Sequence, residues 1–428
     1  MFGAGYVGLV TAACFAELGH VVRLYDADAR KVALLRGGGL PIHEPGLAEV
    51  VARNVRAERL QFASEPAAAV AGARAVFIAV GTPQAPDGRA DISAVRAAAT
   101  AIAHAVDGPT LVVNKSTVPV ETGDLVAAIV REQQPQDHDV RIVSNPEFLR
   151  EGSALADFMH PDRIVFGCDD PQAEAVMREL YAPLDAPVVV VDVRTAEMIK
   201  YTANAFLATK ISFINEIAGI CERVGADINA VVAGVGADRR IGPAFFKAGI
   251  GFGGSCLPKD VSALVRIAQD SDVEPVLLTA VLAVNARQVE RIAARAEKLL
   301  GGLHARRIAV LGLAFKGGTD DVRESPALAL VRRLLDAGAK VVAHDPLAVA
   351  NARAVLGDCI SYADGDDHHA PAAGADALIV ATEWNGYRTL DYARLRRLMR
   401  GDALIDARNV LDGRAARAAG FRYLGVGR

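Results

Sequence analysis

Short apolar runs alternate with longer stretches of helical periodicity through the first part of the chain. Five of these runs end at Asp26, Val80, Lys115, Asn145 and Gly167. Short apolar strands separated by helical segments are typical of a parallel sheet with helices on both faces. We therefore predict an α/β domain over residues 1–194.

From residue 195 the pattern becomes helical without a strand break. The run TAEMIKYTANAFLATKISFINEIAGICERVG predicts one long helix, and further helices follow it. Near Arg306 the alternation restarts, with strands expected in RRIAVLGLAFK, KVVAHDP, ADALIVATEW and DALIDAR. The two ends resemble each other, since VVRLYDAD matches KVVAHDP and ARAVFIAVGTP matches ADALIVATEW. We predict a central helical domain over 195–296 and a second α/β domain over 297–428.

A glycine-rich motif opens the chain. Gly3-Ala4-Gly5-Tyr6-Val7-Gly8 fits GxGxxG at the start of a helical stretch, and Asp26 ends the following strand. These glycines allow a tight turn and close approach to a pyrophosphate at a helix N-terminus, while the acid holds the adenosine ribose. The acid favours NAD over NADP, although Lys31 could reach the same region. The fold class is thus α/β, with two Rossmann-like parallel-sheet domains joined by a central all-helical segment.

The strand that should precede these glycines is reduced to Met1 and Phe2. That strand normally lies at the centre of the sheet, so its loss should be costly. Either the true start lies upstream, or the sequence is truncated.

Composition narrows the function classes further. The net charge is −4 without a long basic run, which argues against nucleic acid as a partner. Five scattered cysteines without a CxxC pair favour neither disulfides nor zinc. With no basic start to a signal peptide and no long apolar run, we expect a cytoplasmic protein that does not enter membranes. His368 and His369 fall in a segment, Gly365–Asp376, that reads as a solvated loop and not as a metal site.

The segment GFGGSCLPKD is the strongest candidate for a chemical centre. Its glycines let the backbone press close to a ligand and leave the thiol of Cys256 accessible. A thiolate is a nucleophile, and Lys200 or Lys259 would favour that form. Asp260 lies four residues on, which places it on the same face of a helical turn. The other four cysteines fit buried, inert thiols.

The motifs taken together resemble one known family. GAGYVGLV, PIHEPGL, VGTP, KSTVP, NPEFLREGSA, KYTANAFLATKISFINE, GFGGSCLPKD and LGLAFKGGTDDVRESPA are similar to segments of the UDP-glucose/GDP-mannose dehydrogenase family. They occur in the family's order and span nearly the whole chain. RIGPAFFKAGIGFGGSCLPKD most resembles the members that oxidise UDP-glucose.

This resemblance implies a four-electron oxidation of the C6 alcohol of a sugar nucleotide to a carboxylate, with two NAD. Cys256 matches the thiol that holds the substrate as a thiohemiacetal and then as a thioester. Lys200 and Asn204 match the residues that stabilise the oxyanion, and their spacing puts both on one helix face.

The resemblance also assigns the acids of the site. Glu151 matches the carboxylate that assists thioester hydrolysis. Thr117 and Asp260 match groups that hold a water and manage protons. Glu147 matches a further acid of the site, whose role stays open.

The binding residues follow from the same matches. The expected cofactor contacts are Gly3, Gly5, Tyr6, Val7, Gly8, Asp26, Lys31, Thr82, Thr117, Glu151 and Arg323. The expected substrate contacts are Phe148, Leu149, Arg150, Glu151, Lys200, Asn204, Arg240, Phe245, Gly253, Lys316 and Arg408. Arg240 would reach the site of a neighbouring subunit, because family members are dimers built through the central helices. The second half has Gly312-Leu313-Ala314 in place of a full GxGxxG, which fits a nucleotide other than NAD.

Three alternatives stay open at this point. The substrate could be GDP-mannose or UDP-N-acetylmannosamine, the chain could be a non-catalytic sugar-nucleotide-binding protein, or it could be a two-electron hydroxy-acid dehydrogenase. The number of NADH formed per sugar separates the last two from a thioester route, since that route requires two.

Overall fold

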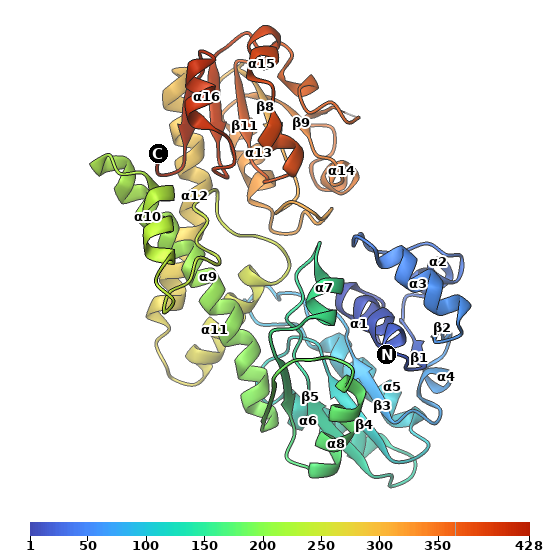
Figure 1. Ribbon diagram of the computed structural model, residues 1–428. Helices are drawn as coiled ribbons and strands as arrows, with labels where there is room; N and C mark the ends of the chain where they lie inside the picture. The colour runs from blue at the N-terminus through green and yellow to red at the C-terminus, as the bar shows by residue number, and fades with distance from the viewer. Residues whose placement is uncertain (364) are drawn as a thin grey trace. The chain divides into compact units, whose positions relative to one another are not determined.

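The computed structural model describes residues 1–363 and 365–428. It divides into two compact units, Met1–Ala203 and Asn204–Arg428 (Figure 1). Each unit contains its own sheet, as the two apolar strand patterns predict.

The main sheet of the first unit has the order β3-β4-β5-β6-β7. Its strands are β3 (Ala75–Ile78), β4 (Thr110–Asn114), β5 (Val140–Ser144), β6 (Ile164–Gly167) and β7 (Val188–Val191). All neighbours are parallel except β5 and β6, which are antiparallel. The chain between β5 and β6 forms only the six-residue helix α7 (Ala154–Met159) in place of a full crossover helix, and the strand direction reverses there.

Met1 and Phe2, a stub of two residues, lie where the first strand of such a sheet is expected. Phe2 forms parallel bridges to Tyr25 on one side and to Ile78 on the other. Its N–H donates to the Phe77 carbonyl at 2.7 Å, and its carbonyl accepts from the Ala79 N–H at 2.8 Å. The stub therefore joins the main sheet to the two-stranded parallel sheet of β1 (Val22–Leu24) and β2 (Leu60–Phe62).

Helices cover both faces of this sheet. They are α1 (Tyr6–Glu17), α2 (Ala29–Arg36), α3 (Leu47–Arg56), α4 (Pro66–Val70), α5 (Ser93–Ala105), α6 (Thr122–Gln133), α7 and α8 (Pro171–Tyr181). Alternate residues of one strand point to opposite faces. Thus Leu111 and Val113 of β4 enter the core formed with α1, α3, α7 and α8, whereas Val112 enters the core formed with α4, α5 and α6.

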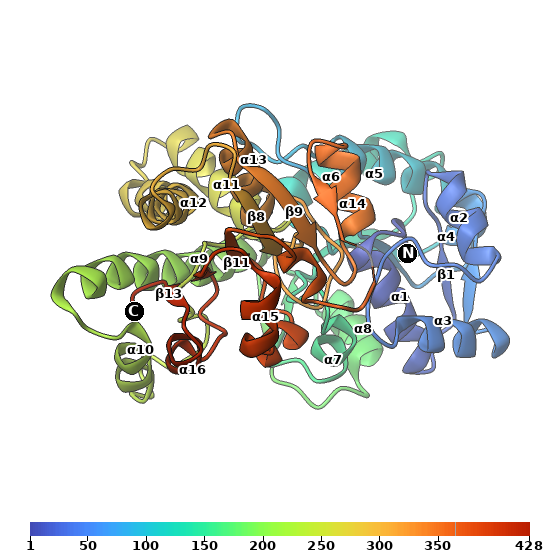
Figure 2. The ribbon, with the colours of Figure 1, turned by 90° about the horizontal axis from the view of Figure 1, so that it is seen from above.

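The sheet of the second unit is parallel throughout, in the order β10-β9-β8-β11-β12-β13. Its strands are β8 (Arg307–Leu311), β9 (Lys340–His344), β10 (Ser361–Tyr362), β11 (Ala377–Val380), β12 (Ala403–Asp406) and β13 (Arg422–Gly425). Figure 2 shows α13 (Pro326–Asp336) and α14 (Val349–Leu356) on one face, with α15 (Tyr392–Leu398) and α16 (Gly413–Ala418) on the other. The core residues alternate accordingly, with Ile308 and Val310 on the first face and Ala309 and Leu311 on the second.

The segment Val193–Leu300 contains helices and no strands. The helices are α9 (Val193–Val224), α10 (Ile228–Gly236), α11 (Leu257–Asp270) and α12 (Val276–Leu300). α9 is a single helix of 32 residues that begins in the first unit and ends in the second. Residues of α9 and α12 share one core with the second sheet. A separate central domain with the boundaries 195–296 therefore stays a prediction.

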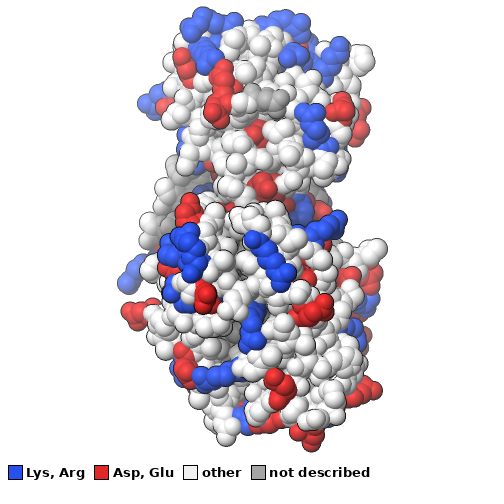
Figure 3. All heavy atoms as spheres, turned by 90° about the vertical axis from the view of Figure 1, so that its right-hand side faces the viewer, with Lys and Arg blue, Asp and Glu red and all other residues white. Residues whose placement is uncertain are grey.

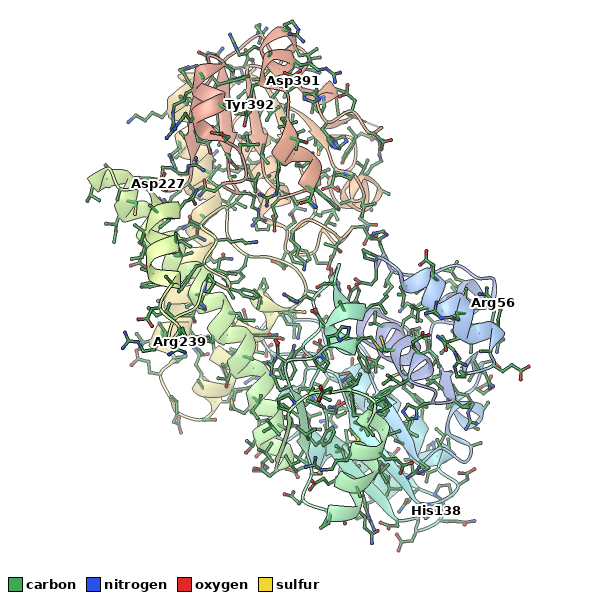
Figure 4. The ribbon with its side chains drawn as sticks, viewed as in Figure 1. Arg56, His138, Asp227, Arg239, Asp391 and Tyr392 are labelled. Carbon is green, nitrogen blue, oxygen red and sulfur yellow. The ribbon has the colours of Figure 1, made fainter. Side chains whose placement is uncertain are left out.

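Local capping explains where several helices begin. The carboxylate of Asp227 accepts from the Asn229 N–H at 2.8 Å and starts α10. Asp391 accepts from the Arg394 N–H at 2.9 Å and starts α15 at Tyr392 (Figure 4). Each side chain satisfies one of the backbone N–H groups that a helix start leaves without a partner.

The segment Gly365–Asp376, which was expected to be a solvated loop, is partly buried. It contains a short 3-10 turn, η1 (Ala370–Ala372). The half-buried ring of His368 packs edge-on against Tyr387 and His344, with centroids 5.3 and 5.1 Å away. The loop therefore contributes to the core on one face of the second sheet.

The distribution of charge and the apolar content of the helices bear on the class of protein. Figure 3 shows basic and acidic side chains interspersed over the face that it draws. Within the residues that the structure describes, no helix is both long enough and apolar enough to cross a membrane.

Candidate active site

The three glycines of the first motif are needed for different reasons. Gly3 has a φ of +108°, and a Cβ there would lie 2.4 Å from the Ala79 carbonyl oxygen. A Cβ on Gly8 would lie 1.9 Å from the carbonyl oxygen of Gly3. A Cβ on Gly5 would meet nothing within 4 Å. The fold itself thus requires Gly3 and Gly8, whereas the space over Gly5 is open to a ligand at the start of α1.

Asp26 lies beside this turn, as predicted. Its carboxylate accepts from the Ala4 N–H at 2.7 Å and from the Asp28 N–H at 2.8 Å. The Lys31 ammonium is 3.5 Å away. A carboxylate offers about four acceptor positions, so Asp26 can still accept from the two hydroxyls of a ribose.

Two more predicted cofactor residues are joined by a hydrogen bond. The buried Thr82 hydroxyl donates to the Thr117 carbonyl at 2.7 Å. This bond connects the ends of β3 and β4, which are adjacent parallel strands. Ligands of such folds bind at the carboxyl ends of the strands. The turn, the acid and this edge together fit a dinucleotide.

The second unit repeats this construction with a different outcome. Asp345 follows β9, just as Asp26 follows β1. Its Oδ2 accepts from the N–H groups of Leu313 and Ala314 at 2.7 and 3.1 Å and from the indole of Trp384 at 3.1 Å. Its Oδ1 accepts from two further N–H groups at 2.9 and 3.0 Å. Five internal donors leave this carboxylate no capacity for a ribose, which agrees with the incomplete glycine motif.

Glu147 and Lys200 form a buried ion pair in the first unit. The Lys200 ammonium lies 2.9 Å from Glu147 Oε1, and the other oxygen accepts from the Leu149 N–H at 2.6 Å. Burial alone would raise the pKa of Glu147, but the charge and hydrogen bond of Lys200 and the Leu149 N–H hold it below its ordinary value. Glu147 is therefore an anion that neutralises Lys200.

A second buried lysine, Lys115, lies close enough to this pair to interact with both charges, and no role for it was predicted from the sequence. Lys115 Nζ donates to Asn145 Oδ1 at 3.1 Å and lies 3.4 Å from the Tyr181 hydroxyl. Burial lowers the pKa of Lys115 to about 8, against the attraction of Glu147 and with the repulsion of Lys200. Only the KSTVP motif could have indicated a role for Lys115, because the charged residues near it, Glu147 and Lys200, are distant in sequence.

The predicted substrate segment 148–151 follows Glu147. The Phe148 ring is covered by the Arg163 guanidinium at 3.5 Å, and Lys200 Nζ is 5.4 Å from the same ring. Arg150 is exposed and pairs with Asp157 at 2.5 Å. Leu149 and Glu151 are partly buried in the same loop. The loop thus presents aromatic, basic and acidic groups from consecutive positions.

Cys256 is exposed at the N-cap position of α11 in the second unit. Its Sγ lies 3.6 Å from the Ser255 hydroxyl. A helix N-terminus carries a partial positive charge, which stabilises a thiolate. The accessibility that a nucleophilic thiol requires is therefore present. Cys14, Cys168 and Cys221 are buried thiols, whereas Cys359 is exposed, contrary to the expectation for it.

Asp260 lies one turn after Cys256 and is fully buried. Its carboxylate accepts from Asn204 Nδ2 at 2.6 Å and pairs with Lys259 Nζ at 2.5 Å. Asn204 keeps its second amide hydrogen for another acceptor. Asn204 and Lys200 are one turn apart on α9, as their spacing predicts.

The glycine loop before Cys256 is held by groups from elsewhere in the second unit. A Cβ on Gly253 would lie 2.1 Å from the Glu324 carbonyl oxygen. The Arg408 guanidinium donates to the carbonyls of Gly251, Phe315 and Ala381 at 3.0, 2.7 and 2.9 Å. Arg408 is thus an internal brace of this loop, and its proposed substrate contact would use its remaining N–H groups.

The other predicted residues of the second unit are more exposed. Arg240 pairs with Asp238 at 2.6 Å and Arg323 with Asp321 at 2.6 Å, and both arginine side chains are mostly exposed. Phe245 is partly buried with a φ of 65°. Lys316 Nζ is 5.7 Å from the ring of Phe315.

The predicted residues are divided between the two units, and α9 carries Lys200 in the first and Asn204 in the second. No group of three His, Cys, Asp or Glu residues within the described part of the chain is arranged to hold a metal ion.

Profiles of one family match the chain in sequence order. The NAD binding domain of the UDP-glucose/GDP-mannose dehydrogenase family matches residues 1–185, the central domain 194–287 and the UDP binding domain 309–413.

Individual relatives agree along the full length. The UDP-glucose 6-dehydrogenase of Rhizobium meliloti is 50% identical over 437 residues, covering 100% of this chain and 99% of the relative. The solved UDP-glucose dehydrogenase of Pyrobaculum islandicum is 46% identical, with a TM-score of 0.93 over 100% of this chain and 96% of that one. The UDP-D-ManNAc dehydrogenase of Pyrococcus horikoshii is 26% identical, with a TM-score of 0.88 over 100% and 98%. Its sequence, its fold and the residues that it brings together agree: the chain belongs to the UDP-glucose/GDP-mannose dehydrogenase family.

Proposed function

We propose that this chain oxidises the C6 alcohol of UDP-glucose to the carboxylate of UDP-glucuronate with two NAD. The observation that carries the proposal is the 50% identity to a UDP-glucose 6-dehydrogenase over the full length of both chains. The UDP-D-ManNAc dehydrogenase is also similar in fold, but its identity is only 26%. UDP-glucose is therefore favoured over the other sugar nucleotides.

Gly3, Gly5, Gly8 and Asp26 would hold NAD, which would supply the hydride acceptor for each of the two oxidations that lead from alcohol to carboxylate. Between the oxidations the Cys256 sulfur adds to the C6 aldehyde, and the new C–S bond gives a thiohemiacetal. Loss of the second hydride leaves a thioester on the same sulfur. The exposed helix N-terminus suits this thiolate chemistry.

Lys200 and Asn204 are proposed to stabilise the negative charge that develops on the C6 oxygen. The Glu147 carboxylate pairs with the Lys200 Nζ at 2.9 Å and favours its charged form. Asn204 is oriented by its hydrogen bond to Asp260 at 2.6 Å, which leaves one amide hydrogen to donate. Two fixed donors lower the cost of an oxyanion because they need no reorganisation during the reaction.

Glu151 is proposed to assist hydrolysis of the thioester. Water adds to the acyl carbon, a C–O bond forms, the C–S bond breaks, and the thiolate of Cys256 is restored. Glu151 takes the proton of the attacking water, with Thr117 and Asp260 holding that water in place. A carboxylate is a suitable base for this step.

The sugar nucleotide is proposed to bind through residues 148–151, Phe245, Gly253, Lys316 and Arg408. The diphosphate carries about two negative charges, which Lys and Arg donors can match. The profile for a UDP binding domain covers residues 309–413, which include the last two of these residues.

A homodimer through α9 belongs to the same proposal. Phe206, Phe213 and Ile220 are 63%, 54% and 53% exposed, and they recur every seven residues, which is close to two helical turns. An exposed apolar stripe of this kind marks a protein contact, and two copies of one helix can cover each other in a symmetric dimer. Arg240 would then act in the partner's site. The five thiols fit a cytoplasmic location.

The test counts NADH per sugar for the wild-type chain and for Cys256→Ala. Wild type should form two NADH for each UDP-glucose consumed. Cys256→Ala should show no sustained turnover while it binds NAD with unchanged affinity. One NADH per sugar would identify a two-electron dehydrogenase, no NADH would identify a binding protein, and steady turnover by the variant would refute the covalent role.

A further inference from the structure

Glu44 is a buried carboxylate without a role in the reaction proposed for this chain. It lies in the PIHEPGL segment between α2 and α3 and is only 5% exposed. Its Oε2 accepts from the Gly152 N–H at 2.6 Å, and its Oε1 accepts from the Ala154 N–H at 2.7 Å. The Tyr6 hydroxyl donates to Oε2 as well. One side chain therefore ties together three segments of the first unit.

Buried carboxylates are costly unless their oxygens are satisfied. Here the donors are two backbone N–H groups and one hydroxyl, and hydrogen bonds to a charged acceptor are stronger than neutral ones. The backbone partners lie 108 and 110 residues away in the sequence. These hydrogen bonds fix the backbone of residues 152–154 against the PIHEPGL segment.

The backbone that Glu44 fixes lies directly after Glu151 in the chain. The Gly152 N–H belongs to the peptide group that follows Glu151, and Gly152 has a φ of +80°. On the other side, the Arg150 N–H donates to Asp157 at 2.8 Å. The backbone of Glu151 is thus held on both sides by carboxylates that lie outside the reaction proposed above.

Tyr6 connects the same carboxylate to the cofactor turn. It is the first residue of α1, and its hydroxyl also accepts from the Gly152 N–H at 2.9 Å. Burial, the hydrogen bond to Glu44 and the charge of Glu151 all raise the pKa of Tyr6, so it stays a neutral donor. The charge of Glu151 is therefore close to this network.

We infer that Glu44 is a positioning residue for thioester hydrolysis, which it supports by fixing the peptide group that follows Glu151. The inference rests on the hydrolytic role proposed for Glu151. In Glu44→Gln one carboxylate oxygen becomes an NH2 group, which would face a backbone N–H and lose that hydrogen bond. Glu151 is then less well aimed at the attacking water. The C–S bond of the thioester breaks more slowly, while the two oxidations that precede it are less affected.

The experiment looks for the thioester itself. Full-length wild type, Glu44→Gln, Glu17→Gln and Glu151→Gln are mixed with UDP-glucose and NAD and quenched in acid during turnover, and the mass of each protein is measured by mass spectrometry. Glu17→Gln is the matched control, because it makes the same carboxylate-to-amide change in the first unit at a side chain whose hydrogen-bond partners are Arg53 and Asn54. Glu151→Gln is the reference for slow hydrolysis. NAD affinity is measured separately for each variant by calorimetry.

For Glu44→Gln we expect turnover to fall at least tenfold, with a UDP-glucuronosyl adduct on most Cys256 thiols and NAD affinity within threefold of wild type. Glu17→Gln should keep turnover within threefold and show no added adduct. If Glu44→Gln does not fold, Glu44→Asp carries the same test, because its shorter side chain cannot span both N–H groups.

Two outcomes would overturn the inference in different ways. If Glu151→Gln accumulates the adduct and the Glu44 variant does not, Glu44 has no part in hydrolysis. If Glu151→Gln itself turns over normally or carries no adduct, the proposed role of Glu151 is wrong, and the inference about Glu44 is wrong with it.

Discussion

Gly5→Ala and Gly8→Ala should separate cofactor binding from folding, although both change one glycine of the same turn. A Cβ on Gly8 would lie 1.9 Å from the Gly3 carbonyl oxygen and 3.3 Å from the Ala79 side chain. The backbone would have to move by more than an ångström to relieve this overlap. Overpacking against fixed neighbours costs typically 1–3 kcal/mol and occasionally more, so we expect a loss of about 3 kcal/mol in the free energy of unfolding.

Gly5 has a φ of −80° and a ψ of −167°, which alanine adopts without strain. Since its Cβ would touch nothing within 4 Å, the folded chain should lose no stability and could gain about 0.4–1 kcal/mol by restricting the unfolded state. The added methyl would instead occupy the space through which the pyrophosphate passes. We expect NAD to bind at least tenfold more weakly, which corresponds to about 1.4 kcal/mol.

Urea unfolding of the full chain, followed by circular dichroism without cofactor, measures the first quantity. Calorimetric titration with NAD measures the second. Normal NAD affinity in Gly5→Ala would refute the placement of the pyrophosphate over Gly5. A Gly8→Ala variant as stable as wild type would refute the packing argument.

Three further predictions concern buried charge and the exposed stripe. Glu147→Gln should cost about 3–5 kcal/mol in urea unfolding because it leaves the Lys200 ammonium buried without its counter-charge, and a loss below 1 kcal/mol would contradict this. Burial raises the pKa of Glu197 to about 7 from its ordinary 4.5, so the folded state binds a proton that the unfolded state has lost between these values. Its stabilising contribution is complete below pH 4.5 and is lost as the pH rises from there through 7. Relative to Glu197→Gln, wild type should therefore lose about 2.5 kcal/mol between pH 5 and pH 8, and parallel stability curves would exclude this. Phe213→Glu should give monomers in light scattering where wild type gives dimers, whereas Leu34→Glu on α2, also exposed, should not.

Much of the fold follows from the sequence because strand and helix patterns are local. The apolar runs that end at Lys115 and Asn145 became β4 and β5, each ending one residue earlier. β2 was not predicted, because three residues with an exposed Gln61 show no usable period. The run that ends at Gly167 became β6, as predicted, but its antiparallel direction was not predicted, since strand direction depends on the path of the chain between strands.

The residues of the candidate site were also predicted only in part. Residues that act through their own side chains, such as Cys256 and Asp26, could be found from motifs, because the chemistry fixes the residue type. Glu44 and Lys115 could not be given a role, because each depends on partners that only the folded chain brings near. The exposed thiol of Cys359 was assigned to the interior, because a lone cysteine carries no signal of depth.

Asp345 shows how two halves of similar construction can differ in the ligands that they accept. Its side chain holds together the turn at Leu313, the helix start at Ala348 and the ring of Trp384. Restoring the missing glycines alone would therefore not make this half accept a dinucleotide. Any redesign would first have to supply other anchors for these three elements, so that the acid is released to face solvent.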